Sequence, residues 1–356
     1  MFLNKFNLMY KNFLTYIQKK LSSKINIDKN YYLVNKLKYL DIGSIGDLKW
    51  PFSCLDSDIY DRIEIEPQYE LNELTKDKKI HNTILWSSSL EKKFYINKGH
   101  MTSSLFKPNL KFLKNFPELN RFEPISETTN KTITLDELFS NNKINTIDFL
   151  KIDVQGSELE ILKGGKNLLN DDIVGMEIEV SFSPIYQNQP LFSDIDIYLR
   201  SVFNLDLWDI NPKYFLYKDG VNKNFSNKGQ LVYGDAIYFR SLETIDKWLS
   251  KFEAKKAKSK LINLINCSLS YGYYDYSYAI LKNEQSNQKY LDNNEIKRFQ
   301  KIVRSNSSIL KINIGNNILF FIFSILANIF RPHHNRWASG GHTLGTRKYL
   351  KFFYRQ

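Results

Sequence analysis

Cysteine is almost absent from this chain: only Cys54 and Cys267 occur among 356 residues. They lie far apart, and neither has a second cysteine at metal-ligand spacing, which argues against a disulfide framework and against a zinc site. A reducing compartment therefore fits the composition best. Histidine is also scarce, and no histidine has a partner at the spacing of a recognised metal site or catalytic pair. The histidines, for which we expect mainly structural roles, are His81, His100, His333, His334 and His342.

Long uninterrupted apolar runs are missing as well. Residues 318–330 are strongly apolar, but Ser324 and Asn328 interrupt them, and the stretch falls short of the ~20 residues that span a bilayer as a helix. Residues 1–20 mix apolar side chains with Asn and Lys and lack a small-residue cleavage site, so we expect no signal peptide. The sequence thus predicts a cytoplasmic protein. It leaves open a peripheral contact of the C-terminal region with the inner face of the membrane.

The charge of the chain is unbalanced. Lys and Arg number 50 against 38 Asp and Glu, for a formal net charge of +12. Such an excess attracts nucleic acid, an anionic membrane surface or an acidic glycan. Most of the excess is lysine scattered among asparagines, whereas clustered arginine is typical of phosphate-binding surfaces. We therefore expect no nucleic-acid partner.

Short apolar runs alternate with helical patterns from residue 39 to about residue 210. This alternation is typical of an α/β fold with a mostly parallel sheet and crossover helices. Apolar residues recur at helical spacing before it, and lysine-rich helical sequence follows residue 240. We therefore predict a basic amphipathic helical segment over residues 1–34, an α/β domain over 35–240, and a basic, mainly helical C-terminal extension over 241–356.

The first candidate ligand-binding motif follows the first of these apolar runs. Asp41, Gly43, Ser44 and Gly46 stand where a strand is expected to end, and glycine there permits a tight turn and a close approach of the backbone to a ligand. The three-glycine pattern of dinucleotide-binding loops is incomplete, which disfavours an NAD-dependent enzyme. The carboxylate of Asp41 instead suits the cationic ammonium and sulfonium groups of S-adenosylmethionine.

A second carboxylate ends the next apolar run. Alternation along residues 62–66 directs Ile63 and Ile65 inward and leaves Glu66 at the tip, just before Pro67. In nucleoside-binding α/β folds, a carboxylate in this place accepts hydrogen bonds from the ribose hydroxyls. We therefore predict that Glu66 binds a ribose.

The most specific motif is the segment 147–165, IDFLKIDVQGSELEILKGG. It resembles the signature of the FkbM methyltransferase family, in which a strand ending in Lys-x-Asp-x-Glu-Gly leads into a helix that begins with a small residue and glutamate. Gln155 departs from this pattern, because the family usually has glutamate there. Other segments resemble the family in order and spacing, so that the resemblance extends from about residue 39 to residue 240. They are residues 66–67, 132–138, 177–179 and 184–192.

The resemblance implies a doubly wound, mostly parallel, seven-stranded sheet of the class I methyltransferase type, with S-adenosylmethionine as the cofactor. It implies O-methylation of a sugar hydroxyl in a glycan or a glycosylated metabolite. We expect no metal site, because the motif secures too few anionic or imidazole ligands. Asp153 is expected to accept the proton of that hydroxyl, with Glu158 and His100 as alternatives. The expected cofactor-binding residues are Asp41, Gly43, Ser44, Gly46, Glu66, Ser104 and Asp153.

Two alternatives stay open at this point. Glu158 could cap the following helix, and Asp153 could receive backbone amides of the loop, so that both would be structural. The chain could also be a catalytically silent cofactor-binding scaffold in a glycan-assembly complex. Gln155 favours that hypothesis, whereas the presence of Asp41, Glu66 and Asp153 opposes it. The sequence predicts neither the identity of the acceptor nor the oligomeric state.

Overall fold

The computed structural model describes residues 36–43, 48, 50–67, 79–81, 83–117, 119–142, 146–218, 229–283, 289–307, 322–323, 325–326 and 338–340. The helical segment predicted over residues 1–34 lies outside the described residues, as do Ser44, Gly46, His333, His334 and His342. Only residues 322–323 and 325–326 of the apolar stretch 318–330 are described. Within these described ranges, no helix is long and apolar enough to cross a membrane.

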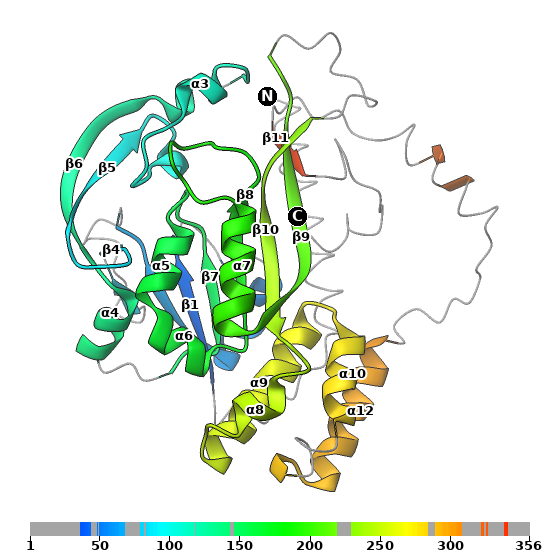
Figure 1. The fold of residues 1–356 in the computed structure, drawn as a ribbon. Helices are drawn as coiled ribbons and strands as arrows, with labels where there is room; N and C mark the ends of the chain where they lie inside the picture. Colours follow the sequence, from blue (N-terminus) through cyan, green and yellow to red (C-terminus); the bar gives the residue numbers. More distant parts are fainter. Residues whose placement is uncertain are drawn as a thin grey trace.

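An eight-stranded mixed sheet forms the centre of the fold, in the order β11-β9-β10-β8-β7-β1-β2-β3 (Figure 1). Neighbouring strands from β3 to β8 pair in parallel, whereas β10 is antiparallel to both β8 and β9, and β11 is antiparallel to β9. The strands are β1 (Leu37–Ile42), β2 (Tyr60–Ile65), β3 (Lys79–His81), β7 (Phe149–Ile152), β8 (Gly175–Ser181), β9 (Leu205–Phe215), β10 (Gln230–Arg240) and β11 (Ala338–Gly340).

The alternation in the sequence therefore predicted the class of fold, a mixed α/β architecture around a central sheet. The predicted number of strands was wrong, because β11 from the C-terminal region pairs with β9 and the described sheet has eight strands instead of seven. Ile84 and Leu85 also do not join this sheet, because they form a strand of a separate sheet.

That separate sheet has three strands in the order β4-β6-β5 (Figure 1). β5 and β6 are antiparallel, and β4 pairs in parallel with β6. Trp86, Phe94 and Leu105 form a small apolar cluster of their own. The strands are β4 (Ile84–Leu85), β5 (Glu91–Asn97) and β6 (Pro124–Ile133), and short helices lie between β5 and β6: η4 (His100–Thr102), α3 (Leu110–Leu113) and η5 (Leu119–Phe122).

Four helices cover one face of the main sheet. Side chains alternate along each strand, so Leu40 and Ile42 of β1 point to this face whereas Leu37 and Tyr39 point to the other. Leu40 and Ile42 pack in one apolar core with helix residues such as Leu162. The helices on this face are α4 (Leu135–Asn141), α5 (Glu158–Gly164), α6 (Lys166–Asp172) and α7 (Phe192–Phe203).

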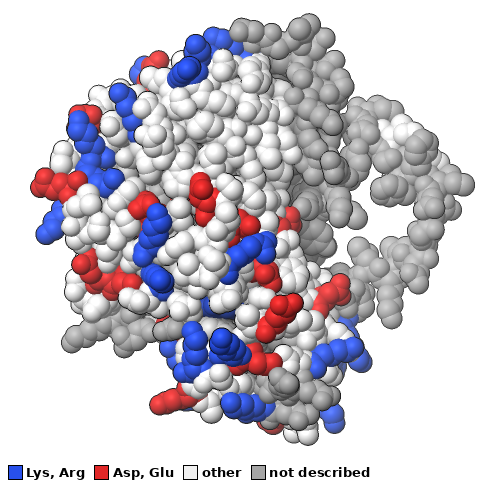
Figure 2. Space-filling model, in the orientation of Figure 1, with Lys and Arg blue, Asp and Glu red and all other residues white. Residues whose placement is uncertain are grey.

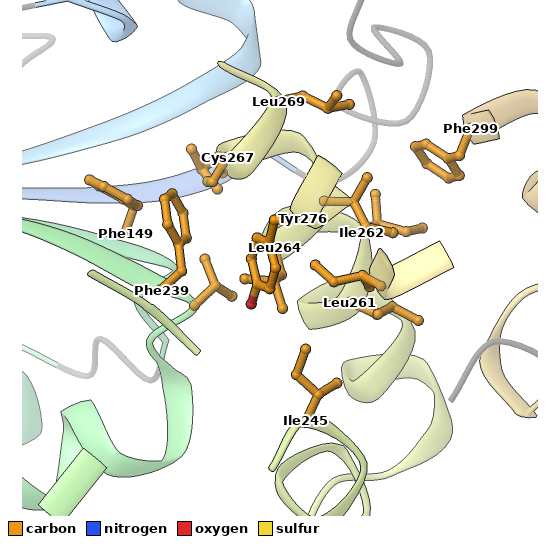
Figure 3. Packing of buried hydrophobic residues seen from close by; sticks show 14 of the residues in the cluster. Phe149, Phe239, Ile245, Leu261, Ile262, Leu264, Cys267, Leu269, Tyr276 and Phe299 are labelled. Atoms are coloured by element: carbon orange, nitrogen blue, oxygen red, sulfur yellow. The ribbon is translucent and has the colours of Figure 1, made fainter. Parts of the chain in front are cut away.

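The helices that follow β10 contribute to the core on the opposite face. Figure 3 shows Phe149 and Phe239 of the sheet among the side chains of Leu264 and Tyr276, and all four belong to one buried cluster. Residues on both sides of position 240 therefore share a core, while the domain boundary at that position stays a prediction. The elements of this face are η1 (Phe52–Cys54), η2 (Ser57–Ile59), α8 (Ile245–Leu249), α9 (Ala254–Ser270), α10 (Tyr274–Lys282) and α12 (Asn293–Ser307).

A buried lysine joins α9 to the sheet. The side chain of Lys260 is 2% exposed, and its Nζ donates hydrogen bonds to the carbonyl oxygen of Ile147 and to Oδ1 of Asp148, both at 2.8 Å. The same Nζ lies 3.5 Å from Oδ1 of Asp172. Because a buried charge is stable only when it is paired and hydrogen-bonded, this interaction fixes α9 against the start of β7.

Replacing Lys260 with Met removes the cation beside the buried carboxylate of Asp148. We expect the free energy of unfolding, measured by urea denaturation, to fall by about 3–5 kcal/mol. Lys255→Met removes an exposed lysine of the same helix and should change this free energy by less than about 0.5 kcal/mol. Equal losses in the two variants would contradict the anchoring role of Lys260.

Candidate functional site

Polar residues gather where the parallel strands end. The register pairs Ile42 with Ile65 and with Ile152, and it pairs Ile152 with Ile178. The residues one position further along the four strands therefore lie at the same edge of the sheet. They are Gly43 after β1, Glu66 after β2, Asp153 after β7 and Glu179 within β8. Open α/β sheets bind ligands at this carboxyl edge, which makes it the candidate site.

Gly43 brings the ends of β1 and β7 into direct contact. Its φ of +78° lies in the left-handed region, and a Cβ at this position would stand 1.9 Å from the carbonyl oxygen of Asp153. The amide of Gly43 donates to the carbonyl of Ile65 at 2.9 Å, and the amide of Asp153 donates to the carbonyl of Ile42 at 3.0 Å. Only glycine fits here, so the predicted glycine turn and the predicted catalytic carboxylate are adjacent.

Asp41 lies deeper, within β1, and is paired inside the sheet. It is 3% exposed. Nη2 of Arg62 donates to Oδ2 of Asp41 at 2.6 Å, and Nζ of Lys151 lies 3.6 Å from Oδ1. Its negative charge thus faces two cations from the neighbouring strands, which sequence reasoning had not foreseen. A direct role of Asp41 in binding a cationic cofactor stays a prediction.

Glu66 ends β2 at the same edge and is 4% exposed. Its backbone position follows Ile65, whose carbonyl accepts the amide of Gly43. Glu66 and the Gly43 turn are therefore neighbours across two strands at the sheet edge. The predicted role of Glu66 in binding a ribose stays a prediction.

The loop between β7 and α5 is held by Glu158. Its Oε1 accepts hydrogen bonds from the backbone amides of Val154 and Gly156, both at 3.1 Å. Burial, with a smaller contribution from the nearby charge of Asp153, raises the pKa of Glu158 to about 7, although the hydrogen bonds from the backbone amides favour the carboxylate. Glu158 thus caps the loop from within, at 4% exposure.

Gln155 connects three elements from the tip of this loop. Its Nε2 donates to Oδ1 of Asp153 at 3.2 Å and to Oε2 of Glu179 at 3.0 Å. Its Oε1 lies 3.0 Å from the hydroxyl of Tyr186, which is also 2.8 Å from the carbonyl oxygen of Thr102. The side chain that departs from the family pattern therefore bridges two carboxylates.

The connection between β5 and β6 contacts the same loop through Ser104. The Ser104 hydroxyl donates to the backbone carbonyl of Gln155 at 2.6 Å, and Ser104 is fully buried. The predicted site residue Ser104 is thus next to the loop of Asp153, and its role in binding the cofactor stays a prediction. His100 begins η4, but its side chain lies outside the described part of the structure, and its predicted role as a base stays a prediction.

Sequence reasoning missed two residues of this site, Glu179 and Tyr186. Both lie in segments that resemble the family, 177–179 and 184–192, but no spacing rule links either residue to Gln155. They meet Gln155 because β8 pairs in parallel with β7 and residue 186 follows β8. The available signal was therefore similarity of sequence alone, and the contacts come from sheet register.

The residues that the structure describes contain no group of three or more His, Cys, Asp and Glu side chains that could hold a metal ion. On the face shown in Figure 2, Lys and Arg are interspersed with Asp and Glu, without one large patch of either sign among the coloured residues.

The raised pKa of Glu158 predicts a dependence of stability on pH. The fold favours its protonated form, so this contribution to stability is fully present below about pH 4.5 and is lost as the pH rises through about 7. Glu158→Gln keeps an acceptor oxygen for the two amides but cannot ionise. Between pH 5 and pH 8, the unfolding free energy of the wild type should fall by roughly 3 kcal/mol relative to this variant. Urea denaturation at each pH measures it, and parallel curves would refute it.

Comparison with known protein families gives one match. Residues 45–203 match the family model described as the methyltransferase FkbM domain. No curated protein and no solved structure matches the chain. The matched range contains Glu66, Asp153, Gln155 and Glu179, and it begins two residues after Gly43. Residues 45–203 of this chain are therefore similar to the methyltransferase FkbM domain.

Proposed function

We propose that this protein is a methyltransferase that uses S-adenosylmethionine to O-methylate a sugar hydroxyl of a glycan or a glycosylated metabolite. The single observation that carries the proposal is the contact between Gly43 and the backbone of Asp153, with Glu66 on the adjacent strand. The strand order β3-β2-β1-β7-β8-β10-β9, with helices on both faces of the sheet, supports a doubly wound core of the class I type.

The residues at the sheet edge fit such a cofactor. We assign Glu66 to the ribose hydroxyls, because a carboxylate after the second strand can accept two hydrogen bonds. Gly43 lets the backbone approach the ligand, and the neighbouring carboxylate of Asp153 complements a cation. The same proposal includes Asp41, Ser44, Gly46 and Ser104 as cofactor-binding residues, with Asp41 acting through the buried charges around it.

S-adenosylmethionine supplies a methyl group on a sulfonium. The protein has to align the acceptor hydroxyl with that methyl group, exclude water and take up the hydroxyl proton. We assign the proton to the carboxylate of Asp153, whose side chain is 19% exposed and so accessible at the edge. Glu158 is less suited, since its Oε1 already accepts two loop amides. His100 stays an alternative base.

Loss of the Glu66 carboxylate should weaken binding of the cofactor. Calorimetric titration of Glu66→Ala with S-adenosylmethionine should give a dissociation constant about 10- to 150-fold higher than that of the wild type, which corresponds to the roughly 1.5–3 kcal/mol of a hydrogen bond to a charged group. Glu91→Ala, which removes an exposed glutamate of β5, is the control and should bind as the wild type does. Saturable binding of NAD instead of S-adenosylmethionine would overturn the assignment.

Replacing Asp153 with Asn tests the base. The variant keeps the size of the side chain but cannot take up a proton readily, so turnover at saturating S-adenosylmethionine should fall by about 100-fold or more, a larger change than the loss of cofactor affinity expected from removing the carboxylate beside the cation. Turnover is followed as release of S-adenosylhomocysteine with a panel of simple sugar acceptors. Unchanged turnover would exclude Asp153 as the base. Cofactor binding by the wild type without turnover on any acceptor would favour the silent scaffold.

The exposed charges of α12 suggest what kind of molecule or surface carries the acceptor hydroxyl. α12 exposes Lys297, Arg298, Lys301 and Arg304, and these cations support a peripheral contact with an anionic membrane or an acidic saccharide. We include this contact in the proposal, together with a cytoplasmic location and the absence of a nucleic-acid partner.

A further inference from the structure

Gln155 occupies a position where a charge would be expected from the family pattern, and its neutral amide contacts both carboxylates beside it. We propose that Gln155 is a positioning residue of the methyl-transfer site: its amide bridges Asp153 and Glu179, so that both carboxylates stay ionised and fixed side by side at the carboxyl edge of the sheet. The inference deepens the proposed function and rests on it.

The backbone directs Gln155 into this position. Its φ of +59° lies in the left-handed region, which is unfavourable for a residue with a Cβ, and Gly156 follows with φ of +104°. The backbone carbonyl of Gln155 accepts the buried hydroxyl of Ser104 at 2.6 Å. The loop conformation is therefore held by contacts on both sides, and the side chain is presented to the ends of β7 and β8.

The two neighbouring carboxylates fix the orientation of the amide, because the single proton of the Tyr186 hydroxyl can go either to Oε1 of Gln155 at 3.0 Å or to the carbonyl oxygen of Thr102 at 2.8 Å. Nε2 faces Asp153 and Glu179, while Oε1 faces the hydroxyl of Tyr186. The opposite orientation would bring Oε1 against two carboxylates, which are acceptors only. Tyr186 is buried, and burial raises the pKa of its hydroxyl, with Glu179 as the next contributor. The hydroxyl therefore stays protonated and can act as a donor.

A carboxylate at position 155 would change the charge of the site. Three carboxylates would then lie within hydrogen-bonding reach of one another, and mutual repulsion would raise the pKa of at least one of them. The amide avoids this repulsion and supplies a donor to both neighbours. Other charged or titratable groups around the bridge are Lys151, which lies 3.7 Å from Asp153, and Glu158, Tyr186, Tyr233, Asp235 and Lys213.

The consequence of the bridge is a pair of ionised carboxylates beside the sulfonium of the proposed cofactor. Asp153 serves as the base, and Glu179 provides a second anionic acceptor within reach of the same amide. With Gln155 neutral, the binding of a cation should displace few protons from this cluster at neutral pH. With glutamate there, the cluster holds a proton that a cation displaces.

The experiment measures protons released on binding of S-adenosylmethionine. Calorimetric titrations at pH 6.5 in two buffers of different ionisation enthalpy give the number of protons exchanged for each molecule bound. We expect Gln155→Glu to release about half a proton or more beyond the wild type. Gln187→Glu adds the same charge at an exposed position next to Tyr186 and should match the wild type.

Gln155→Leu provides a second test without the added charge. It leaves Asp153 and Glu179 without the bridging donor, so it should also release more protons than the wild type, although fewer than Gln155→Glu. Circular dichroism establishes that each variant is folded, and Gln155→Leu decides the question if Gln155→Glu does not fold. A purely structural role would lower the unfolding midpoint of both variants and leave the number of protons unchanged.

The outcomes distinguish a failure of the role proposed for Gln155 from a failure of the proposed function. Binding by the wild type with the same proton release in all variants would overturn the role of Gln155 and leave the proposed function intact. Absence of S-adenosylmethionine binding by the wild type would overturn the proposed function, and the inference about Gln155 with it. Increased proton release by both Gln155 variants, and not by Gln187→Glu, supports the bridge.

Discussion

The contact between Gly43 and the carbonyl of Asp153 is the constraint on which the site depends. A Cβ at position 43 would stand 1.9 Å from that carbonyl oxygen, so the two strand ends can approach only because the side chain is absent. The approach sets where β1 ends relative to β7, and therefore where the carboxylate of Asp153 lies relative to the turn after β1. The loop of Gln155 and Glu158 continues from the same point.

Buried charges accompany this arrangement. In-register neighbours on three adjacent strands are charged, Glu64 beside Asp41 and Asp41 beside Lys151, and Arg62 pairs with both Asp41 and Glu64. Acidic and basic side chains thus compensate one another within the sheet, two residues before the edge. At the edge itself, Asp153 and Glu179 share the amide of Gln155, and Lys151 also lies 3.7 Å from Asp153.

The sequence predicted the parts of the site that depend on position along one strand. Gly43, Glu66 and Asp153 each follow an apolar run, so their place at the carboxyl edge could be deduced. The partners of Asp41 and Gln155 could not, because register between strands decides them. The eighth strand also escaped prediction, since β11 has only three residues. The burial of polar residues in α9 could not be deduced from residue type either, because Asn263 and Asn266 are both buried.

The core shared by the sheet and the later helices has a consequence for biosynthesis. Tyr39 and Phe149 leave the ribosome early, yet the residues of α9 and α10 that cover them belong to the last third of the chain. Until those helices are synthesised, one face of the nascent sheet stays apolar and open to water. Because such surfaces aggregate or recruit chaperones, the strand ends that carry the site acquire their final support late in translation.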